Sequence, residues 1–191
     1  MKITSGKYKY RKLEIPRGIR PTTEKVREAV FSMIQPWLPD AAVLDLFAGS
    51  GAMGLEALSR GAHRCWFCEA NRANQKILAA NIAYCEAGPE AVIIGRDYRA
   101  AIADIAGSSD GVKLDVVIMD PPYGETSYYE TAMLMLQEYG LLDEGSIVVA
   151  EHLYDNKLSD TYGELRRFRE KRYGSIGVDV YTYENRSDDE A

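Results

Sequence analysis

The chain has 191 residues, 46% of them hydrophobic, and a formal net charge of −6 at pH 7. This length and apolar content suffice for one domain with a sizeable core. The three cysteines are an odd number and argue against a disulfide framework, while the basic N-terminus argues against a signal peptide or a membrane span. We therefore expect a cytoplasmic protein that has no membrane partner.

Positive charge is concentrated in the first 27 residues. Nine basic and two acidic residues give this segment a charge of +7, which leaves −13 on the rest of the chain. Tyrosines alternate with cations between Lys7 and Lys12. Basic side chains bind phosphates and tyrosines stack on unpaired bases, so a basic β-hairpin extension over residues 1–20 would suit RNA. A solvated hairpin whose lysines protect its edge explains the composition equally well.

A glycine-rich turn follows the first helical pattern, which covers residues 22–35. The strand-like run 42–47 opens into a turn at 48–54 and then into a helical pattern, as in the first half of a nucleotide-binding βαβ unit. The next strand-like run, 64–68, ends in Glu69. An acid at the tip of the second strand is placed to bind ribose hydroxyls.

The residue before the glycines separates two kinds of cofactor. Residues 49–54 satisfy the dinucleotide spacing G-x-G-x-x-G, but Asp45 precedes them, and a carboxylate there would repel a pyrophosphate. It would suit the sulfonium and ammonium groups of S-adenosylmethionine. The pattern D-x-F-x-G-x-G resembles the first motif of class I methyltransferases, which favours a methyltransferase over a dehydrogenase. The residues expected to bind this cofactor in the loop are Asp45, Phe47, Gly49, Ser50 and Gly51.

A third strand-like run, 91–94, leads to Asp97 and Tyr98. In class I methyltransferases the acid after the third strand commonly reaches the adenine amino group, and by this resemblance we expect Asp97 and Tyr98 to bind the cofactor. Asp97 also suits the N-cap of a helix over 98–105, and the two roles are compatible.

The run 114–119 ends in Asp120-Pro121-Pro122-Tyr123. Prolines cannot continue a sheet ladder, so the chain must turn out at the end of this strand. In open α/β sheets, ligands bind at the carboxyl ends of the strands. A carboxylate, rigid carbonyls and an aromatic ring at that edge could hold a planar group that bears an NH2. A plain turn with Asp120 as a cap is the alternative.

The last third of the chain predicts a different arrangement. Strand-like runs at 145–151, 165–173 and 176–183 follow helical patterns at 71–84 and 127–139, and the last two runs flank Gly174-Ser175 as in a hairpin. We expect the basic cluster at 166–172 to be a solvated face of this hairpin. The whole pattern predicts an α/β, Rossmann-like, mostly parallel seven-stranded sheet with helices on both faces. Residues 21–185 would form this domain, and 186–191 a flexible acidic tail.

Cys65 and Cys68 have C-x-x-C spacing, which raises the possibility of zinc or redox chemistry. They lie on a strand expected to be buried, and no second Cys or His pair has matching spacing. Core packing therefore explains them better, and we expect no metal.

Four segments resemble one family along nearly the whole chain: 5–13, 20–31, 43–51 and 54–61, together with Asp-Pro-Pro-Tyr. They are similar to the bacterial RsmD family of 16S ribosomal RNA guanine-N2 methyltransferases. Family members often carry Arg-Gly-Arg-Lys where this chain has Lys9-Tyr10-Arg11-Lys12. The resemblance implies a class I fold and methyl transfer from S-adenosylmethionine to one guanine amine of 16S rRNA. It implies as partners 16S rRNA or the 30S subunit, and we expect a monomer.

The motifs assign roles to particular residues. Asp120 and the carbonyl of Pro121 would accept hydrogen bonds from the target amine. Pro122 would fix the turn, and Tyr123 would stack on the base. The residues expected to contact RNA are Lys9, Arg11, Lys12, Arg20 and Thr22. Asp-Pro-Pro-Tyr also serves adenine N6, so a DNA or RNA adenine methyltransferase is an alternative. A non-catalytic RNA-binding assembly factor is another, although the intact motifs argue against it.

Overall fold

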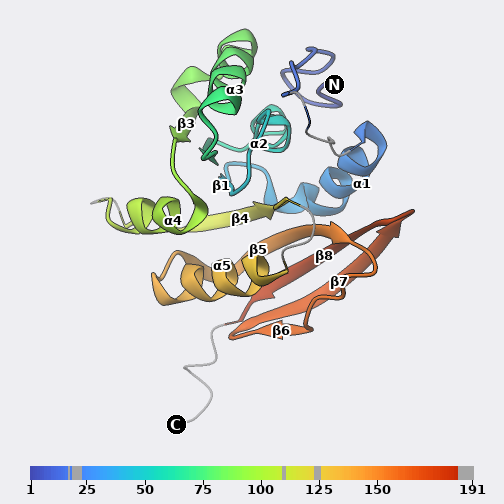
Figure 1. Ribbon diagram of the computed structural model, residues 1–191, viewed down its shortest axis with the longest axis vertical. Coiled ribbons are helices and arrows are strands. Elements are labelled where there is room, and N and C mark those ends of the chain that lie inside the picture. The colour runs from blue at the N-terminus through green and yellow to red at the C-terminus, as the bar shows by residue number, and fades with distance from the viewer. Residues whose placement is uncertain (17, 19–22, 109–110, 123–125, 185–191) are drawn as a thin grey trace.

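The computed structural model describes residues 1–16, 18, 23–108, 111–122 and 126–184. Its centre is an eight-stranded sheet in the order β3-β2-β1-β4-β5-β8-β7-β6 (Figure 1). The five parallel strands are β1 (Ala42–Asp45), β2 (Arg64–Cys68), β3 (Ala91–Ile94), β4 (Leu114–Met119) and β5 (Leu142–Leu153). The antiparallel strands are β6 (Thr161–Tyr162), β7 (Leu165–Tyr173) and β8 (Ile176–Tyr183).

Helices cover both faces of the sheet (Figure 1). The first face carries α1 (Glu24–Ile34), η1 (Gln35–Trp37), α2 (Ala52–Ser59), α3 (Arg72–Cys85) and η2 (Gly88–Glu90). The second face carries α4 (Tyr98–Ala106) and α5 (Ser127–Glu138). Within the described ranges, no helix combines the length and the apolar character that crossing a bilayer requires.

The core alternates between these two faces because successive side chains of a strand point in opposite directions. On β4, Val116 and Ile118 pack with α1, α2 and α3, whereas Val117 and Met119 pack with α4 and α5. All four side chains are buried, and full burial of such a side chain contributes about 1.5–3 kcal/mol. This two-sided burial explains why β4 appears in the sequence as a nearly continuous apolar run.

The α/β fold, the mostly parallel sheet and the terminal hairpin are as predicted, with two differences. The sheet has eight strands rather than seven, because the two-residue β6 pairs with Leu165 and Arg166 and is too short to produce a sequence pattern. The N-terminal segment is not a regular hairpin. It has one isolated bridge, Lys2 to Lys12, and turns at Gly6 and Tyr10, where φ is 80° and 70°.

The carboxyl ends of the parallel strands form one edge of the sheet. There β1 lies between β2 and β4, so the chain leaves the two central strands in opposite directions. A crevice at such a switch point is where open α/β sheets bind ligands. The segments after β1, β2, β3 and β4 all meet at this edge.

Candidate active site

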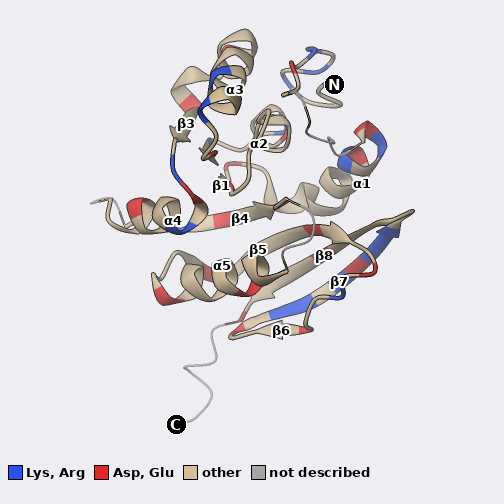
Figure 2. Ribbon diagram, in the orientation of Figure 1, with Lys and Arg blue, Asp and Glu red and all other residues tan. Residues whose placement is uncertain are grey.

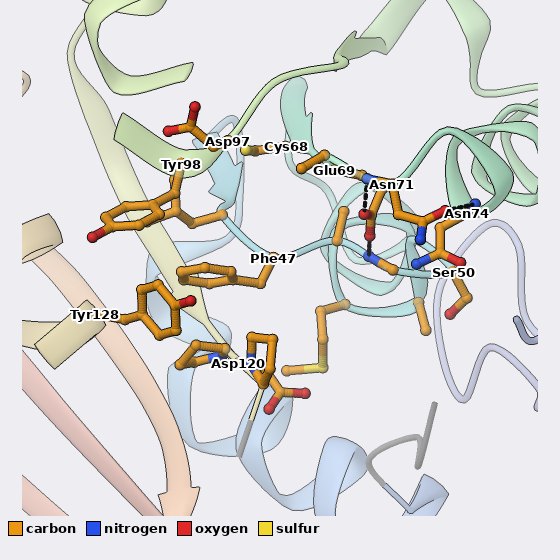
Figure 3. A pocket seen from close by; sticks show the side chains of 18 of the residues that line it. Phe47, Ser50, Cys68, Glu69, Asn71, Asn74, Asp97, Tyr98, Asp120 and Tyr128 are labelled. Carbon is orange, nitrogen blue, oxygen red and sulfur yellow. Dashed lines mark hydrogen bonds between the residues drawn. The ribbon is translucent and has the colours of Figure 1, made fainter. Parts of the chain in front are cut away.

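A cavity of about 740 Å³ opens at this edge, and Figure 3 shows the side chains that line it. Its wall combines residues that follow four different strands. Those predicted from the sequence and found in the wall are Phe47, Gly49, Ser50, Glu69, Asp97, Tyr98, Asp120, Pro121 and Pro122. Tyr123 lies outside the described residues, so its predicted role as a stacking ring has no structural counterpart here.

The glycine loop is held from beneath by Asp45. This side chain is buried rather than part of the cavity wall, and its Oδ2 accepts the N–H of Gly54 at 2.9 Å. Gly51 has a φ of 80°, in the left-handed region, and also lies behind the wall. A Cβ on Gly54 would lie 2.2 Å from the ring of Phe67, so only glycine lets α2 approach β2 this closely.

The charge of Asp45 is unfavourable where it lies. Burial raises its pKa to about 7, and the neighbouring carboxylates of Asp120 and Glu69 add to the effect, against the stabilising N–H of Gly54. Three carboxyl groups therefore interact beneath and around the cavity. An environment of this kind favours a cationic ligand over an anionic one.

Glu69 joins the two loops that follow β1 and β2. Its Oε2 accepts the N–H of Gly49 at 3.0 Å, and its Oε1 accepts the N–H of Asn71 at 2.7 Å (Figure 3). An ionised carboxylate has about four lone-pair sites, so these two bonds leave Glu69 able to accept further hydrogen bonds from the cavity. Its position is thus fixed before any ligand binds.

Aromatic rings form one side of the cavity. Phe47, Tyr98 and Tyr128 contact one another with ring centroids 5.2–5.7 Å apart (Figure 3). Next to them Asp97 caps α4, accepting the N–H groups of Arg99 and Ala100, as the N-cap interpretation predicted. Asp97 also belongs to the cavity wall, so an apolar surface and an acidic residue lie together.

Asp120 and the two prolines contribute the opposite side. The chain leaves β4 at Met119, and Figure 3 shows Asp120 across the cavity from Asp97 and Glu69. Asp120 is half-buried and Pro121 is buried. A group held by Asp120 would therefore approach a ligand held by Glu69 and Asp97 from across the same space.

The N-terminal segment supplies a wall that the sequence did not predict. Met1, Ile15 and Gly18 line the cavity. Asn81 fixes this segment, because its Oδ1 accepts the N–H of Glu14 at 2.9 Å and its Nδ2 donates to the Glu14 carbonyl at 2.9 Å. The same Nδ2 donates to the carbonyl of Ser50 at 2.8 Å, which joins the N-terminal segment to the glycine loop.

A buried ionic network fixes the start of the chain. Glu56 is fully buried and accepts from Arg27 Nε at 3.2 Å and from Arg60 Nε at 2.9 Å. It also accepts from the hydroxyl of Thr4 at 2.6 Å. Arg27 was counted in the basic N-terminal cluster, but it is fully buried and paired, so it is not part of a surface for RNA.

The residues predicted to contact RNA differ in their surroundings. Lys9 and Lys12 are exposed. Arg11 is half-buried, lies 3.6 Å from Glu86 and donates to the carbonyl of Tyr84, so much of its bonding capacity is used within the protein. Arg20 and Thr22 lie outside the described residues.

The two tyrosines of this segment also differ in their exposure. Tyr8 is buried, and its hydroxyl donates to Glu90 at 2.9 Å, whereas Tyr10 is 71% exposed. Of the two, only Tyr10 offers a ring to an external base.

Several wall residues had no signal in the sequence. Tyr128 lies in the first turn of α5, and Asn71 caps α3, and neither belongs to a motif. Cys68 also reaches the wall, and burial raises the pKa of its thiol to about 12. Among the described residues, no group of three His, Cys, Asp or Glu side chains has the geometry of a metal site.

Comparison with known proteins agrees with this architecture. The family model described as conserved hypothetical protein 95 matches residues 1–182. The chain is 36% identical to YlbH of Bacillus subtilis over 95% of this chain and 98% of that protein. It is 34% identical to Ribosomal RNA small subunit methyltransferase D of Escherichia coli K12, over 100% of this chain and 94% of the relative.

The solved structure of yhhF from Escherichia coli superposes with a TM-score of 0.84 at 34% identity, covering 96% of this chain and 98% of that one. The sequence motifs, the sheet order and the family match thus converge. The chain belongs to the family of conserved hypothetical protein 95, which is the RsmD family, and has the class I methyltransferase fold.

Proposed function

We propose that the protein transfers a methyl group from S-adenosylmethionine to the exocyclic N2 amine of a guanine in 16S rRNA, on assembled or assembling 30S subunits. One observation carries the proposal: Asp120-Pro121-Pro122 and the Glu69–glycine-loop unit form opposite sides of one cavity. The similarity to Ribosomal RNA small subunit methyltransferase D supports rRNA as the substrate class. Guanine N2 rests on the family resemblance of the motifs.

The cavity fits the parts of this methyl donor. Glu69, held by Gly49 and Asn71, would accept the ribose hydroxyls. Asp97 would accept the adenine amino group while the apolar surface of Phe47 and Tyr98 covers the ring. The carboxyl-rich surroundings would favour the positive sulfonium and ammonium groups, which a pyrophosphate-bearing cofactor lacks.

The donor, when bound, supplies a methyl group already activated on a sulfonium. The task of the protein is then to make an aryl amine nucleophilic, because its lone pair is delocalised into the ring. Asp120 and the Pro121 carbonyl would accept hydrogen bonds from the amine. These bonds would favour its pyramidal form and stabilise the charge that develops on nitrogen. Tyr123 would stack on the base, and positioning for in-line attack supplies much of the remaining acceleration.

The target base must be unpaired or turned out of its stack to reach Asp120. Lys9 and Lys12 are two exposed cations of the N-terminal segment, and they would hold the surrounding phosphates. The same segment contributes Met1 and Ile15 to the cavity wall, so the RNA-facing and donor-facing surfaces belong to one folded unit.

A methyl-transfer assay with labelled donor tests the proposal. Naked 16S rRNA, 30S particles, DNA and a protein fraction are compared, and the labelled nucleoside is identified after digestion. Label in N2-methylguanosine from rRNA or 30S particles is the expected result. Label only in N6-methyladenine, or no transfer to any substrate by a folded protein that binds the donor, would overturn it.

A further inference from the structure

The second half of β7 exposes a row of cations. Arg169, Lys171 and Arg172 are all exposed, and Figure 2 shows this part of β7 in blue beside β8. The sequence alone suggested only a solvated face. The structure adds the location, the partners and the orientation of these side chains.

The location is the edge at which the cavity opens. β5 runs toward that edge and ends at Leu153, which pairs with Ile176 at the start of β8. Tyr173, at the end of β7, also pairs with Ile176, and the N–H of Tyr154 donates to the Ser175 carbonyl at 2.9 Å. The β7–β8 turn and the cations beside it therefore lie at the same sheet edge as Asp120.

The charges of Arg169 and Lys171 are not neutralised within the described part of the protein, since neither forms an ion pair there. Opposite them on β8 are Val180 and Val178, so both side chains project from one face of the sheet. Glu170, the acid between them, projects from the other face and pairs with Lys157 at 2.7 Å.

The neighbouring cation Arg172 packs on an aromatic ring. Arg172 lies 4.1 Å from the ring centroid of Tyr154, and Lys157 lies 3.7 Å from it. These cation–π contacts hold the side chains of Arg172 and Lys157 in place. Arg172 pairs with Gly177 and shares the face of Glu170, so Arg172, Lys157 and Tyr154 lie on the face opposite Arg169 and Lys171.

Protection of a free edge is the other explanation for charges on β7. Among the described residues β6 pairs only with Leu165 and Arg166, so the rest of the outer edge has no strand partner. Edge protection accounts for charge on β7. It does not require that the unpaired cations lie at the carboxyl edge of the sheet, in a chain of net charge −6.

We infer that Arg169 and Lys171, here called the β7 surface, bind the phosphate backbone of the rRNA next to the target nucleotide. The inference rests on the proposed function, because it names a second contact for the same substrate. The β7 surface and the N-terminal segment would then hold the RNA at two places, and the target base would enter the cavity between them.

The test is the double variant Arg169→Gln/Lys171→Gln, with Arg64→Gln/Lys113→Gln as the matched control. The control also removes one Arg and one Lys, but at the amino edge of the parallel strands, where Arg64 begins β2 and Lys113 precedes β4. Binding of 16S rRNA and of 30S particles is measured over a salt series, and thermal unfolding checks that both variants fold. Arg172→Gln, on the opposite face of the same strand, is a second control and should also bind as wild type.

Each phosphate contact contributes about 0.7–0.9 units to the salt slope. The Arg169→Gln/Lys171→Gln variant is expected to lower the slope by roughly 1.5 units and to weaken binding roughly tenfold or more at low salt, while the control behaves as wild type. Equal slopes for both double variants would overturn the inference. If wild-type protein methylates rRNA in that case, the proposed function stands and only the β7 surface is rejected. If wild-type protein does not methylate rRNA, both are rejected.

Discussion

At the scale of single residues, the carboxyl groups around the cavity have different tasks. Asp45 supports the glycine loop through Gly54, Glu69 connects two loops, and Asp120 ends β4 at the cavity. The sequence predicted all three as site residues, but it treated Asp45 as a direct contact. Asp45 lies behind the wall, which makes its ionisation a matter of stability as well as binding.

The pKa of Asp45, raised from 3.8 to about 7, predicts a pH-dependent stability. Between these values the folded protein binds a proton that the unfolded chain has lost, so the free energy of unfolding falls as pH rises and levels off above pH 7. Asp45→Asn should lack this dependence, so its free energy of unfolding should rise by about 3 kcal/mol relative to that of wild type from pH 5 to pH 8. Denaturant titrations of both proteins at pH 5 and pH 8 measure the free energies of unfolding. The same difference between wild type and Asp45→Asn at both pH values would contradict the prediction.

Asp120→Asn tests the amine contact. Loss of a transition-state acceptor should lower kcat roughly 100-fold or more, with the affinity for S-adenosylmethionine nearly unchanged. Single-turnover methylation and calorimetry separate the two effects. Asp143→Asn, at the opposite end of the sheet in β5, is the control. Near-normal turnover of Asp120→Asn on rRNA would remove Asp120 from the mechanism.

At the scale of elements, two buried polar side chains connect segments that are far apart in sequence. Glu56 joins α2 to α1 and to the first residues of the chain, and Asn81 joins α3 to Glu14 and to the glycine loop. Both lie on helices that the sequence predicted, although α2 begins at Ala52, within the turn expected at 48–54. Neither connection could be predicted, because each depends on which buried face meets which partner.

Glu56→Gln should therefore be strongly destabilising. It leaves Arg27 fully buried without its counter-charge, which costs about 3–5 kcal/mol in comparable cases. Urea unfolding of Glu56→Gln measures the cost, and Arg27→Met/Glu56→Gln should recover part of it because one of the two charges that Glu56 balances, Arg27, is gone while Arg60 remains. No recovery in the double variant would show that the loss comes from elsewhere, such as the contacts with Thr4.

At the scale of the whole molecule, charge is distributed unevenly and partly hidden. Of the cations that give the N-terminal segment its charge, Arg27 is buried, Lys7 is paired with Glu90 and Arg11 is directed at Glu86 and Tyr84. The surface charge available to RNA is therefore smaller than the sequence total suggests. Lys9 and Lys12 remain exposed, and the β7 surface adds a second group of exposed cations.

Lys9→Ala/Lys12→Ala should raise the KM for rRNA or 30S particles and flatten its salt dependence by roughly 1.5 units, without weakening donor binding. Arg11→Ala should behave differently and lower the thermal stability, because its guanidinium binds the Tyr84 carbonyl. Methylation kinetics over a salt series and thermal unfolding distinguish the two. Unchanged KM across the series in Lys9→Ala/Lys12→Ala would argue that this segment does not contact RNA.

The sequence by itself determined the features that depend on neighbours along the chain. β3, β7 and β8 have the predicted bounds, and the glycine loop and Asp120-Pro121-Pro122 occur where their turn chemistry places them. Strand periodicity, glycine at positive φ and the limits that proline imposes are local properties, so a short window of sequence contains them.

Only the tertiary structure decided which distant residues meet. Arg27 pairs with Glu56, and Asn81 donates hydrogen bonds to Glu14 and Ser50, so residues 29 or more positions apart meet. Tyr128 lies in the cavity wall although it belongs to no motif. The tertiary structure likewise decided which cations are exposed and which are paired. Burial and ion pairing depend on the packing of separate elements, and that information is spread over the whole chain rather than held in any one segment.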